Sequence, residues 1–289
     1  MTNPVPAQRP VERDEGLPPR RRVLVALLGP GAPHQAIGAG RVIAQAIGAP
    51  LHGVLVWPTP ITPRDVPSLL EVDPAVLEGM VLDVDVGDPA ERIQAATRSQ
   101  PVAFLVLVAA GTGCDACGLG DLAARLLDEA DAGAIILRPG TWLGPIRRIL
   151  VPVDGKPSTA AALAPAGELA RRTGAALDVV MVDDIASPLF AEPGTLLPPR
   201  YVDQPQHEWP AFSAELIQRL FGAIAQWPPT VPMRLLLGTG QPAAEILRFA
   251  AELEPDLIAL VWHGATPGHG TVFAEVARGT KRPLLVLRA

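Results

Sequence analysis

Aromatic side chains are scarce in this sequence. Phenylalanine, tryptophan and tyrosine make up 4% of the 289 residues, although hydrophobic residues of all kinds make up 48%. The core must therefore be built mainly from alanine, valine, leucine and isoleucine. These residues are typical of parallel strands covered by alanine-rich helices, because such strands are buried on both faces. The composition thus favours an α/β protein.

Cysteine and long apolar runs are also scarce. Two cysteines in a chain of this length do not make a disulfide framework. The longest apolar run, Val102–Ala110, is far shorter than the roughly 20 residues that a membrane-spanning helix needs. The N-terminal segment lacks the apolar core of a secretory signal peptide. We therefore expect a cytoplasmic protein that does not use a membrane.

The sequence also lacks an excess of positive charge. The formal net charge is −6 and the isoelectric point is about 5.4. General binding to nucleic acid or to an anionic membrane surface needs a basic face, so the charge argues against both. The short basic run Arg20–Arg22 is interpreted as a solvated edge. No nucleic-acid partner is expected.

What the sequence does contain is an internal duplication. Residues 22–28 and 148–154 are similar apolar runs at an offset of 126 (148 − 22), and the offset holds without a gap to Val56 and Val182. One repeat spans about half of the chain, which predicts two similar domains rather than a solenoid. The predicted parts are a disordered proline-rich tail at 1–21 and domains at 22–140 and 146–289.

Both repeats alternate apolar runs with helix-forming segments. This alternation predicts a parallel, doubly wound sheet, in which ligands bind at the carboxyl ends of the strands. One continuous helix is expected over 159–172 and another over 211–226. The predicted strands are 22–28, 51–57, 81–86, 102–109 and 134–138 in the first repeat, and 148–154, 176–182, 233–237, 257–262 and 283–288 in the second.

Five segments follow one another along the second repeat: Arg148–Asp154, Gly240–Ile246, Asp256–Leu260, Gly270–Thr271 and Pro283–Arg288. In their order and spacing they resemble a universal stress protein domain, and the first repeat resembles it more faintly. The chain as a whole is therefore similar to a tandem member of that family. The resemblance implies two α/β domains, each with a five-stranded parallel sheet in the order 3-2-1-4-5 and helices on both faces.

Some members of the family bind ATP, and the resemblance implies where such a site would lie. Residues at the end of the first strand meet the adenosine, a residue at the end of the second strand flanks the base, and a glycine-rich loop before a helix holds the phosphates. Free N–H groups at a helix start suit this last role. The matching residues are Pro152, Val153, Asp154, Val182, Gly264, Gly268, Gly270 and Thr271.

This loop departs from the pattern of the ATP binders. Gly268 follows Gly264 after three residues instead of two, and one residue instead of nine separates Gly268 from Gly270. The first repeat departs further, because Leu28 stands in the place of Asp154 and Asp121 in the place of Thr271. We therefore expect weak binding of ATP or AMP at most, confined to the second repeat.

Other polar residues suggest sites without establishing one. Cys114 and Cys117, with His34 and Asp115 or a water, have the ligand types of a zinc site. Unpaired loop thiols are the simpler interpretation, so we expect no metal. His263 and His269 flank the glycines of the second repeat and could contact a phosphate or a metal, although surface loop histidines usually contact neither. Lys156 could neutralise a phosphate or simply be solvated. We find no catalytic motif.

Three classes of function stay open at this point. The favoured one is a non-catalytic stress-response or regulatory protein that senses a small ligand. The second is a module that binds a protein partner through its proline-rich insertions, 58–63 and 187–210. The third is an enzyme of the adenine-nucleotide hydrolase type, although Asp154–Ser158 lacks the glycine pair expected there.

The last strand of each repeat predicts how the two domains meet. Ala134–Leu137 and Leu284–Leu287 are apolar and fall at the edge of their own sheets. An exposed apolar edge favours aggregation. We therefore expect these strands to pair antiparallel around a pseudo-twofold axis, so that a monomer imitates a family dimer or a homodimer forms.

Overall fold

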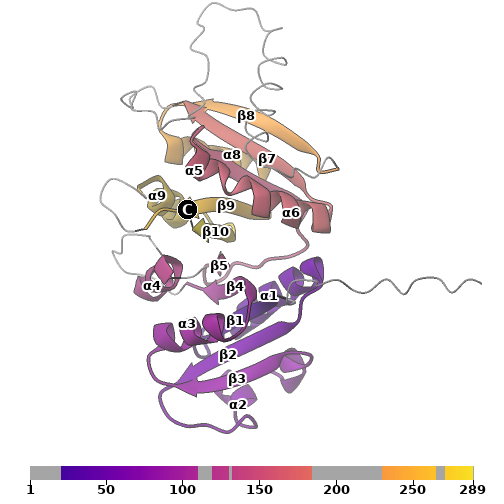
Figure 1. Cartoon of the computed structure of the whole chain (residues 1–289), viewed down its shortest axis with the longest axis vertical. Helices are drawn as coiled ribbons and strands as arrows, with labels where there is room; N and C mark the ends of the chain where they lie inside the picture. Colours follow the sequence, from indigo (N-terminus) through magenta and orange to yellow (C-terminus); the bar gives the residue numbers. More distant parts are fainter. Residues whose placement is uncertain (1–20, 110–118, 130–131, 184–229, 265–270, 289) are drawn as a thin grey trace, which may run out of the picture.

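The computed structural model describes residues 21–109, 119–129, 132–183, 230–264 and 271–288. The molecule is elongated, and one sheet runs through it from end to end (Figure 1). Several predicted features fall outside the described residues. They are the tail, the insertion 187–210, the helix 211–226, the cysteine pair, His269, and the glycines Gly268 and Gly270.

Each half of the chain contributes five strands. The first half contains β1 (Arg22–Leu27), α1 (Pro33–Ile47), β2 (Leu51–Trp57), α2 (Val66–Leu69), η1 (Pro74–Leu77), β3 (Val81–Val86), α3 (Pro89–Ser99), β4 (Val102–Val108), α4 (Asp121–Glu129) and β5 (Gly133–Leu137). The second half contains β6 (Arg148–Val153), α5 (Pro157–Ala160), α6 (Leu163–Thr173), β7 (Ala176–Asp183), β8 (Met233–Thr239), α8 (Pro242–Leu253), β9 (Leu257–Trp262), α9 (Thr271–Gly279) and β10 (Leu284–Arg288).

The strand order is β3-β2-β1-β4-β5-β10-β9-β6-β7-β8. Within each half all pairs are parallel and the order is 3-2-1-4-5, as the family resemblance implied. The two halves meet through β5 and β10, which pair antiparallel with Leu285 opposite Ile135. The predicted pairing of the two final strands is therefore confirmed.

One predicted helix is wrong in its bounds. The expected single helix over 159–172 is two helices, α5 and α6, with a break at Ala161 and Ala162. Pro165 explains the break, because a proline ring clashes with the carbonyl group four residues earlier, at Ala161. In the observed structure Pro165 lies in the first turn of α6, where its missing N–H group has little cost.

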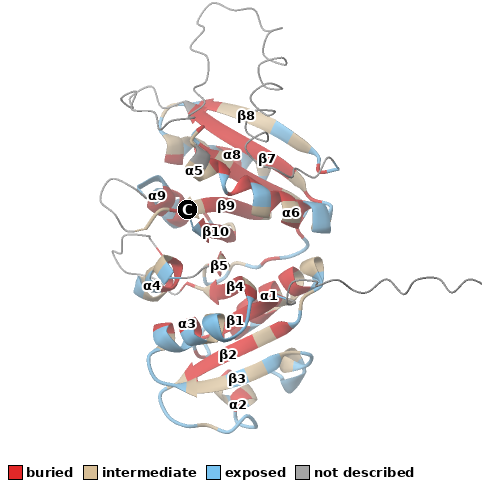
Figure 2. Ribbon diagram, in the orientation of Figure 1, coloured by how far each residue is buried: buried red, intermediate tan, exposed pale blue. Residues whose placement is uncertain are grey.

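The core lies in two layers, one on each face of the sheet. Helices α1, α2, α5 and α6 pack on one face, and α3, α4, α8 and α9 pack on the other. Both layers contain residues from both halves, so the hydrophobic core is continuous across the β5–β10 junction. Figure 2 shows that the central strands are buried, whereas the two edge strands, β3 and β8, are partly exposed.

Small residues let the helices approach the sheet closely. At Gly40 in α1, a Cβ atom would lie 2.5 Å from Cγ2 of Val25 and 3.0 Å from Cδ1 of Leu51. No side chain fits in this space without displacing the core of the first half. Glycine at position 40 thus lets α1 pack directly against β1 and β2.

An arginine at the start of the first strand is repeated in both halves. Arg22 in β1 donates to the carbonyl oxygen of Ala96 near the end of α3 (2.6 Å), and Arg148 in β6 donates to that of Leu253 at the end of α8 (3.3 Å). A cation is favourable at a helix C-terminus, where carbonyl groups lack intrahelical partners. Each arginine therefore caps the crossover helix of its own half.

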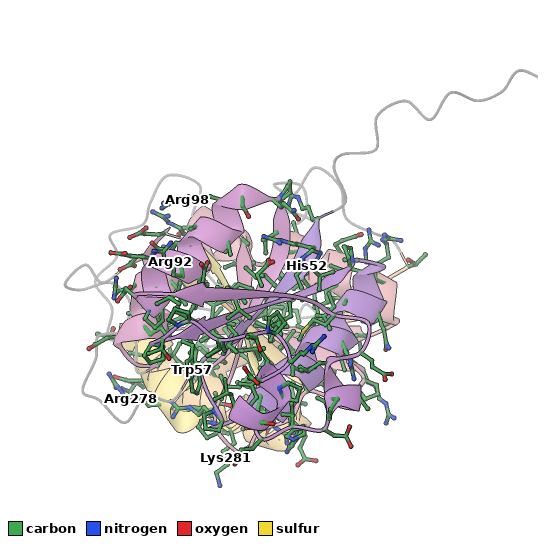
Figure 3. All side chains as sticks on the ribbon, turned by 90° about the horizontal axis from the view of Figure 1, so that it is seen from below. His52, Trp57, Arg92, Arg98, Arg278 and Lys281 are labelled. Carbon is green, nitrogen blue, oxygen red and sulfur yellow. The ribbon has the colours of Figure 1, made fainter. Side chains whose placement is uncertain are left out.

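The two arginines differ in their neighbour on the next strand. Arg148 lies beside Asp178, whereas Arg22 lies beside His52, with 3.2 Å between Nη1 of Arg22 and Nδ1 of His52. Figure 3 labels His52 in a view from the β3 end of the molecule. Arg22 is 3% exposed, and its Nε has no hydrogen-bond partner. The first half thus holds a buried guanidinium against a neutral imidazole.

This contact predicts that acid destabilises the first half. Burial lowers the pKa of His52 below its usual 6.5, the charge of Arg22 lowers it further, and Asp83 opposes the change. As the pH falls below about 6.5, His52 therefore takes up a proton more readily in the unfolded chain than in the folded chain. The free energy of unfolding decreases as the pH is lowered through this range. Urea unfolding between about pH 8 and about pH 5 measures this decrease in stability. The variant His52→Gln should not show it, because glutamine does not titrate.

A second acid-sensitive group titrates in a different range. The hydrogen bond from Arg171 holds the pKa of Glu168 at about 2, against a usual 4.5, with Arg172 also contributing. Glu168 therefore adds stability that is lost only as the pH falls from about 4.5 towards 2. An equal loss near pH 6 in wild type and His52→Gln would contradict the role given to His52.

Candidate functional site

The loop after β6 is organised by Asp154. Its Oδ1 accepts hydrogen bonds from the backbone N–H of Lys156 (3.0 Å) and from the hydroxyl of Thr159, and its Oδ2 pairs with Nζ of Lys156 (3.1 Å). Gly155 has a φ of 80°, which allows the tight turn between these residues. The carboxylate is exposed at the carboxyl edge of the sheet and at the same time holds its own loop in place.

Pro152 helps to open the sheet at this edge. The carbonyl of Arg148 accepts from the N–H of Asp256, so every second residue of β6, including Pro152, directs its backbone groups towards β9. Proline has no N–H to donate there. The register between β6 and β9 accordingly covers only Ile149↔Leu257 and Leu150↔Ile258. The strand order reverses at β6, so this is where a doubly wound sheet places its ligand.

The pleat of β6 separates the predicted adenosine-facing residues. Leu150 and Val182 belong to the core layer of α8 and α9, whereas Val151 and Val153 belong to the layer of α5 and α6. Pro152 therefore shares a face with Val182. The side chain of Val153 is buried on the opposite face, so only its backbone is available to a ligand at this edge.

The exit of β9 supplies the other side of the site. Trp262 ends this strand in the core, and His263 and Gly264 follow, with a φ of 82° at Gly264. Helix α5, just beyond the Asp154 loop, contacts β9. Thr271 is exposed at the first position of α9, where free N–H groups favour an anion. The structure thus brings Asp154, Val182, Gly264 and Thr271 to the carboxyl edge of one half.

The corresponding edge of the first half lacks a carboxylate at the end of its first strand. Leu28, in the place of Asp154, is 40% exposed, and Asp121 begins α4 in the place of Thr271. His34 is exposed near the start of α1. Within the described ranges, no three His, Cys, Asp or Glu side chains are grouped to hold a metal ion.

Two contacts of Asp154 were not predicted from the sequence. Thr159 was assigned to a helix that starts near Ser158, but its hydroxyl binds Asp154. Lys156 was considered as a phosphate ligand or a solvated residue, and it pairs with Asp154. The five-residue spacing of Asp154 and Thr159 around a glycine turn is the one local signal that could have suggested the first contact.

A third unpredicted contact joins the two halves. The indole N–H of Trp262 donates to Oδ1 of Asp128 in α4 at 2.7 Å. The rings of Trp262 and Phe273 lie 4.9 Å apart between centroids, at an angle of 57°. Trp262 ends the predicted strand 257–262 and is buried, but nothing in the sequence indicates its polar partner.

No helix among the described residues has the length and hydropathy needed to cross a membrane.

Comparison with solved structures shows that the fold extends over both halves. A universal stress protein from Archaeoglobus fulgidus is 14% identical and has a TM-score of 0.60, over 93% of this chain and 98% of its own. A protein from Pseudomonas aeruginosa described as a universal stress protein is 16% identical with a TM-score of 0.62, over 93% of both chains.

A shorter structure matches half of the chain. This universal stress protein, solved in complex with cAMP, is 20% identical with a TM-score of 0.35, over 50% of this chain and 98% of its own. The sequence pattern of the universal stress protein family matches residues 145–288, the segment that contains Asp154, Val182, Gly264 and Thr271. Through this segment the chain belongs to the universal stress protein family.

Proposed function

We propose that the protein is a non-catalytic regulatory member of its family whose second half binds an adenine nucleotide weakly. The observation that carries the proposal is the position of Asp154. It follows β6 at the carboxyl edge, beside the point where the β6–β9 ladder ends, and the first half has Leu28 there instead. Such a carboxylate can accept a hydrogen bond from a ribose hydroxyl.

The contacts of Asp154 support weak binding. Its two oxygens already accept from Thr159 and Lys156, so a ribose hydroxyl must share or replace one of these partners. The exposed ion pair with Lys156 is the easiest to give up, because such pairs contribute little in water. Lys156 would then be available to the phosphates.

The phosphates contribute little in this proposal. Backbone N–H groups of a long glycine loop and a helix start supply most of the phosphate binding in such sites. The segment between Gly264 and Thr271 has only six residues (265–270), several fewer than the ATP-binding pattern requires. Adenosine therefore carries most of the affinity, and the number of phosphates matters little.

A regulatory role fits the surroundings of Asp154 better than a catalytic one. General acid–base catalysis needs a second group that can take or give a proton near the reacting bond. The described side chains that contact Asp154 are Thr159, a hydroxyl, and Lys156, an ammonium already paired with it. We therefore propose ligand sensing without turnover.

Isothermal titration with adenosine, AMP and ATP tests this function. We expect dissociation constants of about 0.1 to 1 mM that differ by less than about threefold among the three ligands. Asp154→Ala should weaken binding about tenfold or more, because it removes the hydrogen-bond acceptor of the site. Leu28→Ala, at the same position of the first half, is the matched control and should have no effect.

Two results would change the assignment. A dissociation constant of about 1 μM or below, with a strong dependence on the γ-phosphate, would contradict the weak role given to the phosphates. No response to any of the three ligands would contradict nucleotide binding and favour a protein-interaction module that uses the insertion 187–210.

A further inference from the structure

The bond between Trp262 and Asp128 crosses from one half of the chain to the other. The indole is buried in the core of the second half, and its N–H donates at 2.7 Å to a carboxylate on α4 of the first half. A hydrogen bond to an ionised acceptor is stronger than one between neutral groups. A buried indole N–H without a partner would also be unfavourable. This single bond therefore constrains where the indole lies.

Trp262 lies where the end of β9 meets the start of α9 at the candidate site. We call this region, residues Trp262–Gly264 and Thr271–Phe273, the ligand corner. It is the last residue of β9, directly before His263 and Gly264, and its ring contacts Phe273, the third residue of α9. The indole thus links the end of β9 to the first turn of α9. Any shift of the indole changes the position of the first turn of α9 relative to β9.

A second contact from the first half holds the other end of α9. Arg138, which directly follows β5, donates through Nε to the carbonyl oxygen of Ala277 at 2.9 Å, and its Nη2 donates to the same oxygen. Ala277 lies in the last turn of α9, where a cation is favourable. Helix α9 is therefore positioned at both ends by residues that depend on the first half.

The bond between Trp262 and Asp128 has no counterpart with the roles of the two halves exchanged. The matching fourth strands place Ala109 where β9 has Trp262 (262 − 153), and the matching helices place Arg278 where α4 has Asp128 (128 + 150). Neither residue can reproduce the indole–carboxylate bond in the opposite direction. The half that has lost its own carboxylate thus supports the half that retains Asp154.

We propose that Asp128 is a positioning residue for the ligand corner of the second half. Through Trp262 it fixes the first turn of α9 against β9, and so sets the N–H groups that face a phosphate. The first half acts as a built-in partner that completes the site without binding a ligand itself. The statement about ligand affinity rests on the proposed function, whereas the statement about local geometry does not.

Hydrogen exchange measured by mass spectrometry tests the geometric part on the intact chain. Asp128→Ala should speed exchange about tenfold in peptides that contain Trp262–Gly264 and Thr271–Phe273, because the corner opens more often. Asp128→Asn keeps an acceptor oxygen and should stay within about threefold of wild type. Glu129→Gln is the matched control, since it changes the next residue of α4 and removes only an exposed pair with Arg98.

A second variant guards against a folding defect in Asp128→Ala. Trp262→Phe keeps an aromatic ring but removes the N–H donor, and it should speed exchange in the same two peptides. Unchanged exchange there in both variants would overturn the proposal. A uniform increase over the whole sheet would overturn it too, since it would show a general stabilising role rather than local positioning.

Titration then separates this inference from the proposed function. Asp128→Ala should weaken AMP by up to about threefold, to the affinity of adenosine, and leave adenosine unchanged, because α9 faces the phosphate and not the base. Equal weakening of both ligands would overturn the phosphate-specific role. If wild-type protein binds neither ligand, the proposed function fails, and the exchange experiment alone decides whether Asp128 positions the corner.

Discussion

Leu285→Asp is expected to destabilise the protein by more than about 4 kcal/mol. Leu285 is fully buried at the centre of the β5–β10 pairing and lies opposite Ile135 within the core layer shared by both halves. An aspartate there must either ionise without a partner or fold as a neutral acid, and both are unfavourable in an apolar site. Urea unfolding of the intact chain measures the free energy lost.

An exposed strand position provides the control for this substitution. Val81→Asp introduces the same charge into β3, the edge strand of the first half, where the side chain is 55% exposed. Its effect should stay within about 0.5 kcal/mol, as is usual for surface changes. If Leu285→Asp cost no more than Val81→Asp, the two halves would not be paired in solution through β5 and β10.

A double-mutant cycle measures the pairing itself. Leu285→Ala and Ile135→Ala each remove one member of the opposed pair, and each should cost about 2 to 5 kcal/mol. Because the two residues are register partners in the same core layer, their effects should deviate from additivity by about 0.5 to 3 kcal/mol. Strict additivity would show that the two residues do not touch, against the antiparallel register observed here.

Asp178→Ala is expected to have the second-largest effect, a loss of about 3 kcal/mol. Asp178 is 1% exposed in β7 and accepts from Arg234 of β8 through both carboxylate oxygens, with Nε of Arg148 3.6 Å from Oδ2. Removing one member of a buried ion pair usually costs about 3 to 5 kcal/mol. The Arg234 side chain is 51% exposed and can turn to water, so we expect the lower end of this range.

An exposed cluster of the same composition is the control for Asp178. Glu168 in α6 also pairs with two arginines, Arg171 and Arg172, but all three side chains reach solvent. Glu168→Ala should therefore cost much less than Asp178→Ala, because exposed ion pairs contribute little. Equal losses from the two substitutions would show that burial does not determine the strength of these clusters.

Much of the fold was predictable because its signals are local or repeated. Fully buried parallel strands are continuous apolar runs, so most strand bounds matched to within a residue or two. The constant offset of 126 residues carried each assignment in one repeat to the other, and Gly48 and Gly174 end equivalent helices with φ values of 65° and 72°. The β5–β10 pairing followed from two apolar edges that each needed a partner.

The break between α5 and α6 was predictable in principle but was missed. The alanine-rich composition favours a helix over the whole segment, and this average conceals one proline. Pro165 interferes with a single carbonyl, that of Ala161, and is compatible with helix on its C-terminal side. The position of the break therefore depends on one residue rather than on the composition of the segment.

The sequence alone determined the repeat, the strand order through the family resemblance, and the edge at which Asp154, Val182 and Thr271 meet. Only the tertiary structure decided that the Val153 side chain is buried on the face opposite Val182, that Thr159 and Lys156 bind Asp154, and that Asp128 binds Trp262 across 134 residues. Periodicity and turn chemistry act over a few residues and can be read locally. A side-chain contact between distant elements depends on pleat, register and helix placement together, and these are set only when both core layers pack.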